Sequence, residues 1–396
     1  MRGARGASVS DPRPIVAMEL FSCSGGMAEG FRRAGLEMTL VFDHDGDACA
    51  SYEANLGRRP IRLDAHDLLR MTEAGWRPPA LDLVVADPPC TPWSSAGQRR
   101  GLADERDCLL ATARLLALWR PRAWLVGNVP GLALEPARPA RDLAFEPLNA
   151  AGYCIDHATL DAADHGVPQH RVRPFWFGHL SGECLRWPVR TYWSPEKAGP
   201  TLFGEARPAW VTCREALGHL SGPDLGRPIR LRRRDRVGAS RESEPDAPAK
   251  TVTTSPLGDG NVLAVRGARE AQERASRAGA PARTLTSSAL ITTKGASRSA
   301  VDTATLAWPW NRPATTVTAD ERIPPPGHHD ETQLSLPGAI LLSERAGAIL
   351  QGFPAGWTFR GRSKVSRWSQ IGQAMPPPLA EAVARSVRTQ LEATPS

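Results

Sequence analysis

The chain has 396 residues, of which 41% are hydrophobic, and this size predicts one large domain together with a smaller one. Its 49 Lys and Arg residues against 42 Asp and Glu give a net charge of +7, which allows a polyanionic partner without proving one. The seven cysteines are scattered and include no CxxC pair, which argues against a disulfide framework and against a zinc site. No apolar run is long enough to span a bilayer and no signal peptide opens the chain, so we expect a cytoplasmic protein without membrane contact.

Short apolar runs alternate with helical patterns after a polar tail over residues 1–14. This alternation predicts a parallel sheet covered by helices on both faces, in a doubly wound α/β domain over residues 15–186. In such sheets ligands bind beyond the carboxyl ends of the strands. The expected strands cover residues 15–21, 39–45, 81–89, 123–129 and 171–180, and the expected helices cover residues 28–35, 47–57, 105–121 and 140–152.

The composition of the sequence changes after this domain, with more Pro, Gly, Ser, Thr and Arg and fewer helical patterns. We expect a second, β-rich domain over residues 187–335, and a closing amphipathic helix within the C-terminal segment 336–396. In the second domain a phrase recurs as PAKTVT from Pro248, PARTLT from Pro281 and PATTVT from Pro313. Because Thr alternates with Val or Leu after a fixed proline, the phrase predicts three similar strand starts.

A basic run, RPIRLRRRDR over residues 227–236, concentrates the arginine of the second domain. A solvated loop and a phosphate-binding segment explain such a run about equally well, so both interpretations stay open at this point.

The stretch MELFSCSGGMAEGF, residues 18–31, reads as a strand, a turn of small residues and the start of a helix. Small residues let a ligand approach the backbone, and a helix N-terminus offers unpaired amides to an anionic group. The next strand ends in FDHD, residues 42–45, where an acid can accept both hydroxyls of a ribose. The two features favour an adenosine-containing cofactor, and without a GKS or GKT phosphate loop a nucleoside triphosphate is not expected.

One cysteine, Cys90, lies between prolines in VVADPPCTPWSSAG, residues 84–97, at the carboxyl end of an expected strand. A buried inert thiol is the usual interpretation of a single cysteine. Here a Pro-Pro-Cys-x-Pro loop is a poor place to bury a small apolar group, and its stiffness favours a nucleophile held rigid.

The order of motifs along nearly the whole chain resembles that of the cytosine-5 DNA methyltransferases of bacterial or phage type. The segments that carry this resemblance are LFSCSGGMAEGF, FDHDGDACASYEANL, DPPCTPWSSAG, GNV at 127–129, QHRVR at 169–173, LQGFP at 350–354 and QIGQAMPP at 370–377.

The resemblance implies a Rossmann-like domain that binds S-adenosylmethionine, with the β-rich domain recognising the target and the last helix rejoining the first domain. It implies double-stranded DNA as substrate, a monomer, and a cognate restriction endonuclease as a candidate partner. The Cys90 thiolate would add to carbon 6 of a cytosine flipped out of the duplex, because neither ring atom is reachable by thiolate and cofactor inside the stack. With this substrate class the basic run favours phosphate contact.

The resemblance also implies roles for single residues. Arg171 and Arg173 would hold the cytosine carbonyl oxygen and order the loop of the nucleophile, unless they form salt bridges within the fold. The alternative interpretation of Asp43 and Asp64 is an exposed acid at a strand end, and that of the segment from Phe21 to Met27 is a simple tight turn. The catalytic set would be Cys90, Arg171, Arg173, Gly127 and Asn128, and the cofactor-binding set Phe21, Ser24, Gly25, Gly26, Met27, Asp43, His44, Asp64, Pro88, Gln373 and Met375.

The chain departs from the family where the usual Glu-Asn-Val reads Gly127-Asn128-Val129. The expected carboxyl group contacts ring nitrogen 3 and the exocyclic amine of cytosine, and general acid help of this kind contributes about 10²- to 10⁴-fold in rate. Three interpretations follow: a slower methyltransferase in which water or Glu135 partly fills the role, an enzyme for another or a modified base, or a protein that binds DNA without modifying it. The retained Cys90, cofactor turn and arginines favour the first.

Two further alternatives remain. Gln373 stands where the family more often has Asn, which leaves an altered methyl donor open. An RNA substrate would use the same chemistry, but a second, basic domain between the QHRVR and LQGFP motifs favours duplex DNA.

Overall fold

The computed structural model describes residues 14–89, 108–200, 206–224, 226–228, 233–234, 240–241, 262–264 and 339–393. Cys90, the tail up to residue 13, the three PAxTxT phrases and most of the basic run 227–236 lie outside these residues. What the sequence indicates for those parts therefore stays a prediction.

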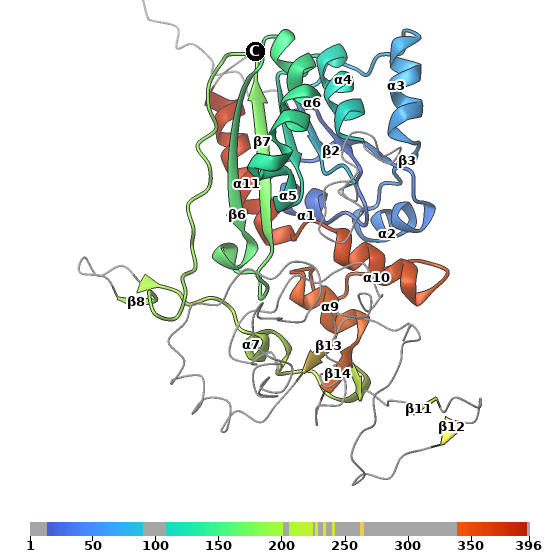
Figure 1. Cartoon of the computed structure of the whole chain (residues 1–396), viewed down its shortest axis with the longest axis vertical. Coiled ribbons are helices and arrows are strands. Elements are labelled where there is room, and N and C mark those ends of the chain that lie inside the picture. The colour runs from blue at the N-terminus through green and yellow to red at the C-terminus, as the bar shows by residue number, and fades with distance from the viewer. Residues whose placement is uncertain are drawn as a thin grey trace, which may run out of the picture.

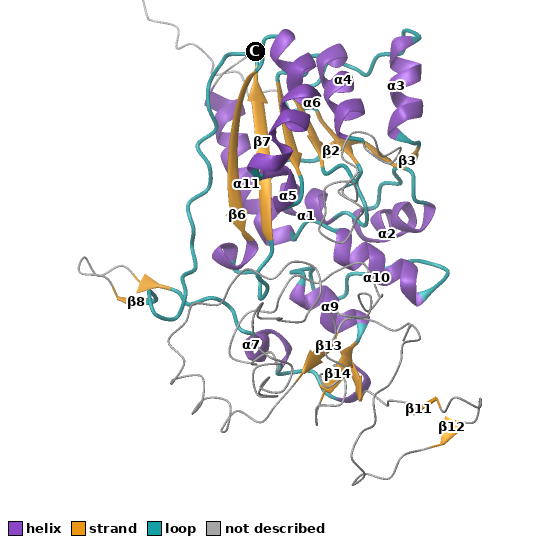
Figure 2. Cartoon of the chain, in the orientation of Figure 1, coloured by secondary structure: helices purple, strands orange, loops and turns teal. Residues whose placement is uncertain are grey.

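A central sheet runs through the first domain in the strand order β3-β2-β1-β4-β5-β7-β6. Strands β1 to β5 pair in parallel, whereas β7 pairs antiparallel with both β5 and β6. The predicted fold class, a doubly wound α/β domain, is confirmed (Figure 2). The strands are β1 (Ala17–Leu20), β2 (Met38–Asp43), β3 (Ile61–Arg62), β4 (Leu83–Ala86), β5 (Ala123–Gly127), β6 (Cys154–Asp161) and β7 (Val172–His179).

Helices cover both faces of the sheet (Figure 1). The helices α1 and α11 contribute to one hydrophobic cluster, and α3, α4 and α6 contribute to the other. The helices of the described residues are α1 (Gly26–Arg33), α2 (Gly46–Leu56), α3 (Ala65–Glu73), α4 (Leu109–Trp119), α5 (Pro130–Ala133), α6 (Arg138–Ala150), α7 (Cys213–Leu217), α9 (Glu344–Leu350), α10 (Lys364–Gln373) and α11 (Pro377–Ala393).

The alternation of side chains along β4 explains how one strand serves both faces. Leu83 and Val85 belong to the cluster beneath α1 and α11, whereas Val84 and Ala86 belong to the cluster beneath α3, α4 and α6. All four are at most 1% exposed, which is why the strand reads as a continuous apolar run rather than an alternating one.

The all-parallel sheet expected from the sequence is wrong for its last two strands. β6 was not expected, because its side chains are mostly half-buried or exposed and it therefore lacks an apolar run. It lies at the sheet edge and returns directly into β7 through residues 162–171, and strands joined this closely pair antiparallel. This turn places QHRVR at the entry of β7, against β5.

The helix α1 packs against the start of α11, more than 340 residues further along the chain. A Cβ atom on Gly26 would lie 2.2 Å from the carbonyl oxygen of Met375, and one on Gly30 would lie 2.5 Å from Ala380 Cβ and from the carbonyl oxygen of Pro377. The two glycines, four positions apart, thus give α1 a flat face on which the C-terminal backbone rests. The expected return of the last helix to the first domain is confirmed.

The described part of the second region is smaller and adjoins the C-terminal segment. Strand β14 (Ala339–Leu342) pairs with β10 (Gly226–Pro228) and β13 (Val262–Ala264), so the C-terminal segment begins within this region before it returns to the first domain. A hydrophobic cluster joins α7, α9 and α10. The remaining short strands are β8 (Gly199–Pro200), β9 (Ala206–Arg207), β11 (Arg233–Arg234) and β12 (Ser240–Arg241).

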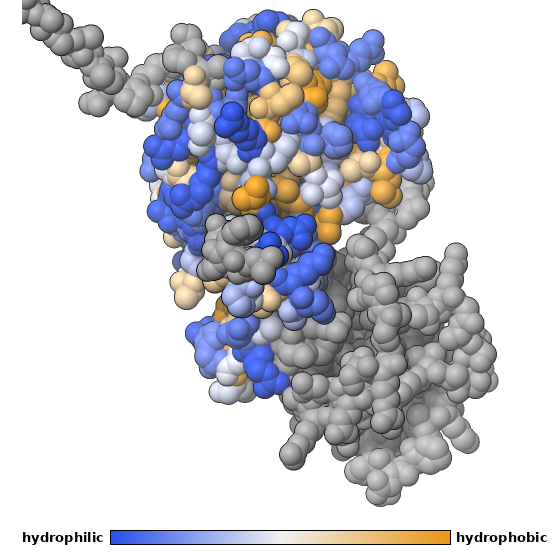
Figure 3. All heavy atoms as spheres, turned by 90° about the vertical axis from the view of Figure 1, so that its left-hand side faces the viewer, coloured by the Kyte–Doolittle hydropathy of each residue, from blue (hydrophilic) through white to orange (hydrophobic). Residues whose placement is uncertain are grey.

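Among the described residues, no helix is long and apolar enough to cross a membrane. The face of the molecule in Figure 3 intersperses hydrophilic and hydrophobic residues over the first domain.

The packing of α1 against α11 can be tested with Gly30→Ala. Alanine normally favours a helix interior over glycine by roughly 1 kcal/mol. Here we expect the opposite sign, a loss of about 1–3 kcal/mol in the free energy of unfolding, because the new methyl group overlaps α11. Gly46→Ala is the control, since its Cβ would meet only the Arg62 side chain at 3.7 Å. Urea denaturation measures both, and a Gly30→Ala variant as stable as wild type would contradict the close packing.

Candidate active site

The turn after β1 has an unusual backbone. Phe21 and Cys23 have positive φ angles of 58° and 49°, and Gly25 has a φ of 93°. Glycine is required at position 25 for a second reason, because a Cβ atom there would lie 2.8 Å from Leu56 and 3.1 Å from Tyr52. Strained non-glycine residues persist only where the surroundings impose them, and they concentrate at ligand sites.

The same turn holds polar groups without a partner. The hydroxyl groups of Ser22 and Ser24 are buried, and within the described part of the chain neither makes a hydrogen bond. The N-terminus of α1, which begins at Gly26, has no side-chain cap. Met27, one residue further, is buried in the cluster beneath α1. Buried hydroxyls are rarely left unpaired, so the turn is suited to a polar ligand.

Asp43 ends β2 beside this turn. Its carboxylate accepts the amide of Cys23 at 2.7 Å and that of Asp45 at 2.8 Å, which locks the turn to the strand. Burial raises the pKa of Asp43, while these two amides act in the opposite direction. A carboxylate has about four lone-pair sites, so two amides leave room for further donors.

Two other expected residues lie next to Asp43. Asp64 lies two residues beyond β3, which pairs with the end of β2, and its carboxylate caps α3 by accepting the amide of His66 at 2.8 Å. The ring of His44 is largely exposed and lies 3.6 Å from the Asp43 carboxylate. The strand ends therefore bring Asp43, His44 and Asp64 together, as parallel pairing requires.

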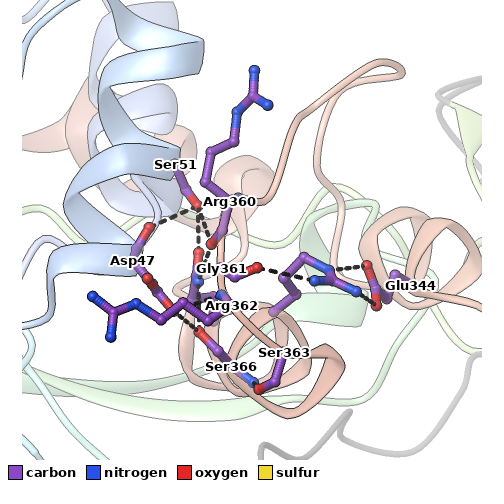
Figure 4. Close-up of polar contacts among 10 residues, drawn as sticks. Asp47, Ser51, Glu344, Arg360, Gly361, Arg362, Ser363 and Ser366 are labelled. Atoms are coloured by element: carbon purple, nitrogen blue, oxygen red, sulfur yellow. Dashed lines mark hydrogen bonds and ion pairs between the residues drawn. The ribbon is translucent and has the colours of Figure 1, made fainter.

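The helix α2 is fastened to the C-terminal segment by a polar cluster that we call the latch (Figure 4). Ser51, fully buried on α2, donates to Gln370 Oε1 at 2.5 Å and accepts the amide of Arg360 at 2.7 Å. One turn earlier, Asp47 accepts the hydroxyl of Ser366 at 2.7 Å and the amide of Arg362 at 3.1 Å. The serine bond and then the amide hold the pKa of Asp47 below its usual range.

The latch continues towards the second region. Arg367 forms a two-pronged ion pair with Glu344 at the start of α9, with N–O distances of 2.8 and 2.9 Å. It also donates to the carbonyl oxygen of Gly361 at 3.1 Å. Helix α2, which follows Asp43, and helix α9, which follows β14, are therefore both held to the segment 360–367.

The carboxyl ends of β4 and β5 meet next to the segment that bears Cys90. Asn128 is buried, and its side chain donates to the carbonyl oxygen of Pro88 at 3.4 Å and accepts the amide of Val129 at 2.8 Å. It thus ties the end of β5 to the residue two positions before Cys90. This is a positioning contact, and it accounts for a buried amide at this point of the chain.

Gly127 leaves little vacant space where a side chain would start. A Cβ atom there would lie 3.1 Å from the terminal methyl of Met375 and 3.2 Å from the ring of Phe175. The sequence analysis placed Met375 near the cofactor pocket, and the structure places its side chain over Gly127. An apolar group therefore occupies the start of the path that a longer side chain at position 127 would follow.

The two arginines of QHRVR differ in their surroundings. Arg171 is 1% exposed and donates to the carbonyl oxygen of Gly372 at 2.7 Å, so it binds the main chain in the last turn of α10. Arg173 is also buried, but its contact with the Val172 carbonyl oxygen at 3.5 Å is marginal, and within the described residues its Nε has no partner. Arg171 is therefore the more firmly bound of the two guanidinium groups.

Three placements concern other expected residues. Gly26 lies against the main chain of Met375, as described above, and Gln373 is exposed at the end of α10. Glu135, the suggested substitute for the missing carboxyl group, is 79% exposed at its side chain and pairs with Arg138 at 3.2 Å. That suggestion is wrong, because a solvated carboxylate held by its own helical turn is not directed at a buried strand end.

Sequence reasoning missed a chain of buried glutamines. Gln169 donates to Gln351 at 2.7 Å, and Gln351 in turn donates to the carbonyl oxygen of Ala374 at 2.5 Å. Gln169 opens the motif QHRVR and Gln351 is the second residue of LQGFP, two motifs that the sequence offers only as family signatures. Their pairing depends on chain segments about 180 residues apart, which no local pattern reveals.

Two carboxyl groups of the sheet were also missed, one buried and one half-buried. Glu19 on β1 is 1% exposed, and its pKa is raised well above the usual value, chiefly by burial and against a hydrogen bond with Tyr52. Asp87 directly follows β4, and burial raises its pKa although the charges of Arg173 and Arg171 act against this. An acid placed at the end of an apolar run was the available signal for Asp87.

Comparison with known proteins matches this chain to one family. A model of C-5 cytosine-specific DNA methylases matches residues 15–228 and 232–389. The type II methyltransferase M.NaeI of Lentzea aerocolonigenes is 28% identical over 95% of this chain and 75% of its own length. M.AgeI of Thalassovita gelatinovora is 31% identical over 51% of this chain, and the match spans only half of that relative's length.

Solved structures share the fold. A DNMT2 mutant from Spodoptera frugiperda superposes with a TM-score of 0.54 at 13% identity, covering 96% of this chain and 100% of that one. The Dnmt2 methyltransferase of S. pombe gives a TM-score of 0.51 at 15% identity, covering 96% of this chain and 99% of that one.

The latch can be tested by Ser51→Ala. Without the hydroxyl group, Gln370 Oε1 and the amide of Arg360 lose a buried partner, so we expect the free energy of unfolding to fall by about 1–3 kcal/mol. Thr389→Ala is the matched control, because that hydroxyl is exposed and bonds only back to Arg385 within its own helix, and we expect a change within about 0.5 kcal/mol. Chemical denaturation compares the two, and equal effects would show that the latch does not stabilise the fold.

Proposed function

The chain belongs to the C-5 cytosine-specific DNA methylase family, and on this premise we propose that it transfers a methyl group to carbon 5 of cytosine in duplex DNA. The observation that carries the proposal is the register of three adjacent strands. Leu20 of β1 pairs with Ala86 of β4, and Ala86 pairs with Val126 of β5. The cofactor turn, the segment leading to Cys90 and the Gly127-Asn128 pair therefore leave the sheet side by side, at one edge.

S-adenosylmethionine is the cofactor that we propose, and the residues at the turn fit it. The unpaired hydroxyls of Ser22 and Ser24 and the uncapped start of α1 suit its polar methionine end. The Asp43 carboxylate, with lone pairs left over, suits the ribose hydroxyls, and Asp64 would lie near the adenine. When bound, this cofactor would supply an electrophilic methyl group.

The chain's own residues would make the cytosine ring nucleophilic. In this proposal Cys90 acts as a thiolate that adds to carbon 6 of the flipped base, so that carbon 5 gains electron density. Asn128, bonded to the carbonyl oxygen of Pro88, would hold the segment that precedes Cys90. Arg173 retains donors for the base carbonyl oxygen, whereas Arg171 would act on the loop through the main chain that it binds.

The finer features of this function are proposals as well. We assign target recognition to residues 187–335, with phosphate contacts from the basic run 227–236. We further propose that the protein is a monomer in the cytoplasm and that its partner is a cognate restriction endonuclease. A competition assay between duplex DNA and transfer RNA distinguishes the proposed substrate from RNA.

The proposal predicts that Cys90→Ala abolishes methyl transfer, because the substitution removes the thiolate that adds to the ring. Cys154→Ala, which removes an exposed thiol at the start of β6, is the control and should transfer at the wild-type rate. The assay follows label from S-adenosylmethionine into duplex DNA. In a second assay, a duplex containing 5-fluorocytosine should form a trapped covalent complex with the wild-type protein and none with Cys90→Ala. Undiminished transfer by Cys90→Ala would rule out the thiolate mechanism, and no transfer by wild type would rule out the function.

A further inference from the structure

We propose that Asp87 supplies the carboxyl group that the family carries at position 127, and that it protonates ring nitrogen 3 of the target cytosine. This inference rests on the proposed function and names a further catalytic residue for it. The carboxyl group would be carried by the end of β4 instead of the end of β5, at the same level along the two strands.

The strand register supports this placement. The parallel pairing of β4 with β5 runs from Leu83 with Ala123 to Ala86 with Val126, so the next pair in register is Asp87 with Gly127. Side chains at paired positions of neighbouring strands point to the same face of a sheet. Position 87 thus lies on the same face as position 127, about one strand spacing away, roughly 4.8 Å.

The alternation of the core confirms which face this is. Leu83 and Val85 of β4, and Ala123 and Leu125 of β5, all belong to the cluster beneath α1 and α11. Two positions on, the same face receives Asp87 from β4 and Gly127 from β5. The atoms that surround the absent side chain of Gly127, from Met375 and Phe175, belong to that cluster as well.

Arg173 provides an independent observation at the same place. Position 173 follows the same alternation along β7 as Phe175 and Phe177, which both belong to this cluster. The buried guanidinium of Arg173 has an unpartnered Nε within the described residues, and its charge acts on Asp87. Such a cation would stabilise the Asp87 carboxylate that forms when the proton has left.

The surroundings of Asp87 shift its pKa towards that of a proton donor. Burial raises its pKa, and Arg173 and Arg171 only partly offset this. Glu19 and Cys23 also face it, since the charge of Asp87 raises the pKa of both. Glu19 bonds to Tyr52 and lies within β1, level with Val85, so it is set back from the strand ends that Asp87 and Gly127 occupy. Burial raises the pKa of the Cys23 thiol to about 12, which makes it a poor proton donor.

The proposed step balances as follows. The Cys90 thiolate forms a bond to carbon 6, the π pair of the carbon 5–carbon 6 bond moves into the carbon 4–carbon 5 bond, and the carbon 4–nitrogen 3 π pair moves onto nitrogen 3. That nitrogen takes the proton of Asp87, which becomes a carboxylate beside Arg173. Once carbon 5 carries the methyl group that a bound cofactor would supply, nitrogen 3 returns the proton to Asp87. A water molecule then takes the proton of carbon 5, the carbon–hydrogen pair re-forms the carbon 5–carbon 6 double bond, and the Cys90 thiolate leaves with the carbon 6–sulfur pair.

The test compares single-turnover rates of Asp87→Asn and wild type, followed as tritium release from DNA labelled at carbon 5 of cytosine. Asparagine keeps the size and can still bond to the base but cannot transfer a proton, so we expect the rate to fall by about 10²- to 10⁴-fold with little change in KM. The wild-type rate should decline at high pH as Asp87 loses its proton, and this decline should be absent from the residual rate of Asp87→Asn.

Two variants separate catalysis from folding. Asp82→Asn alters a buried Asp at the other end of β4, also beside an arginine, and should leave the rate unchanged whatever it does to thermal stability. Asp87→Ala combined with Gly127→Glu returns the carboxyl group to the family's position, and it should recover at least tenfold over Asp87→Ala alone, because Met375 ends in a flexible methyl group that can move aside.

The outcomes separate the two proposals. A wild-type rate that survives in Asp87→Asn would overturn the role of Asp87 and leave the methyltransferase function standing. The proposal would also be overturned, in favour of a purely structural Asp87, by a rise in KM as large as the fall in rate, together with an unchanged pH profile and no recovery in the double variant. If wild type releases no tritium and transfers no methyl group, the proposed function fails and the role of Asp87 fails with it.

Discussion

The parallel register that joins β1, β4 and β5 determines where every part of the candidate site lies. Because Leu20, Ala86 and Val126 are paired at one level near the ends of their strands, the three segments that follow emerge together. A shift of one strand by a single residue would turn its side chains to the opposite face, and Asp87 or the Gly127 position would then point into the cluster beneath α3, α4 and α6. The buried apolar runs of these strands are thus a condition for the chemistry as well as for stability.

The C-terminal segment completes what the sheet begins. It contributes Met375 over Gly127, the carbonyl oxygen that Arg171 binds, and the side of the latch that holds α2. None of these contacts could form in the first 186 residues alone. Contacts between such distant segments carry a large loop-closure cost, which the apolar packing of α1 on α11 offsets.

The sequence predicted what local patterns encode. The apolar run 81–89 indicated β4, and the acid of FDHD was expected at a strand tip, where Asp43 lies. The sequence could not reveal that Arg171 binds the main chain at Gly372, because that contact depends on how two segments 200 residues apart come together. For the same reason β6, which has little apolar signal at a sheet edge, was missed. Asp87 lies three residues before Cys90 in the sequence, yet only the strand register relates it to Gly127.

The contact between Met375 and Gly127 has a consequence for how this chain can change. Its methyl group lies within 3.1 Å of where a Cβ atom at position 127 would be, so a return of the family's glutamate meets resistance from a residue nearly 250 positions away. A return of glutamate therefore requires the Met375 side chain to move aside, whereas shortening Met375 while glycine remains would open a void beside the ring of Phe175. The energetic costs of substitutions at positions 127 and 375 should therefore depend on each other rather than add independently.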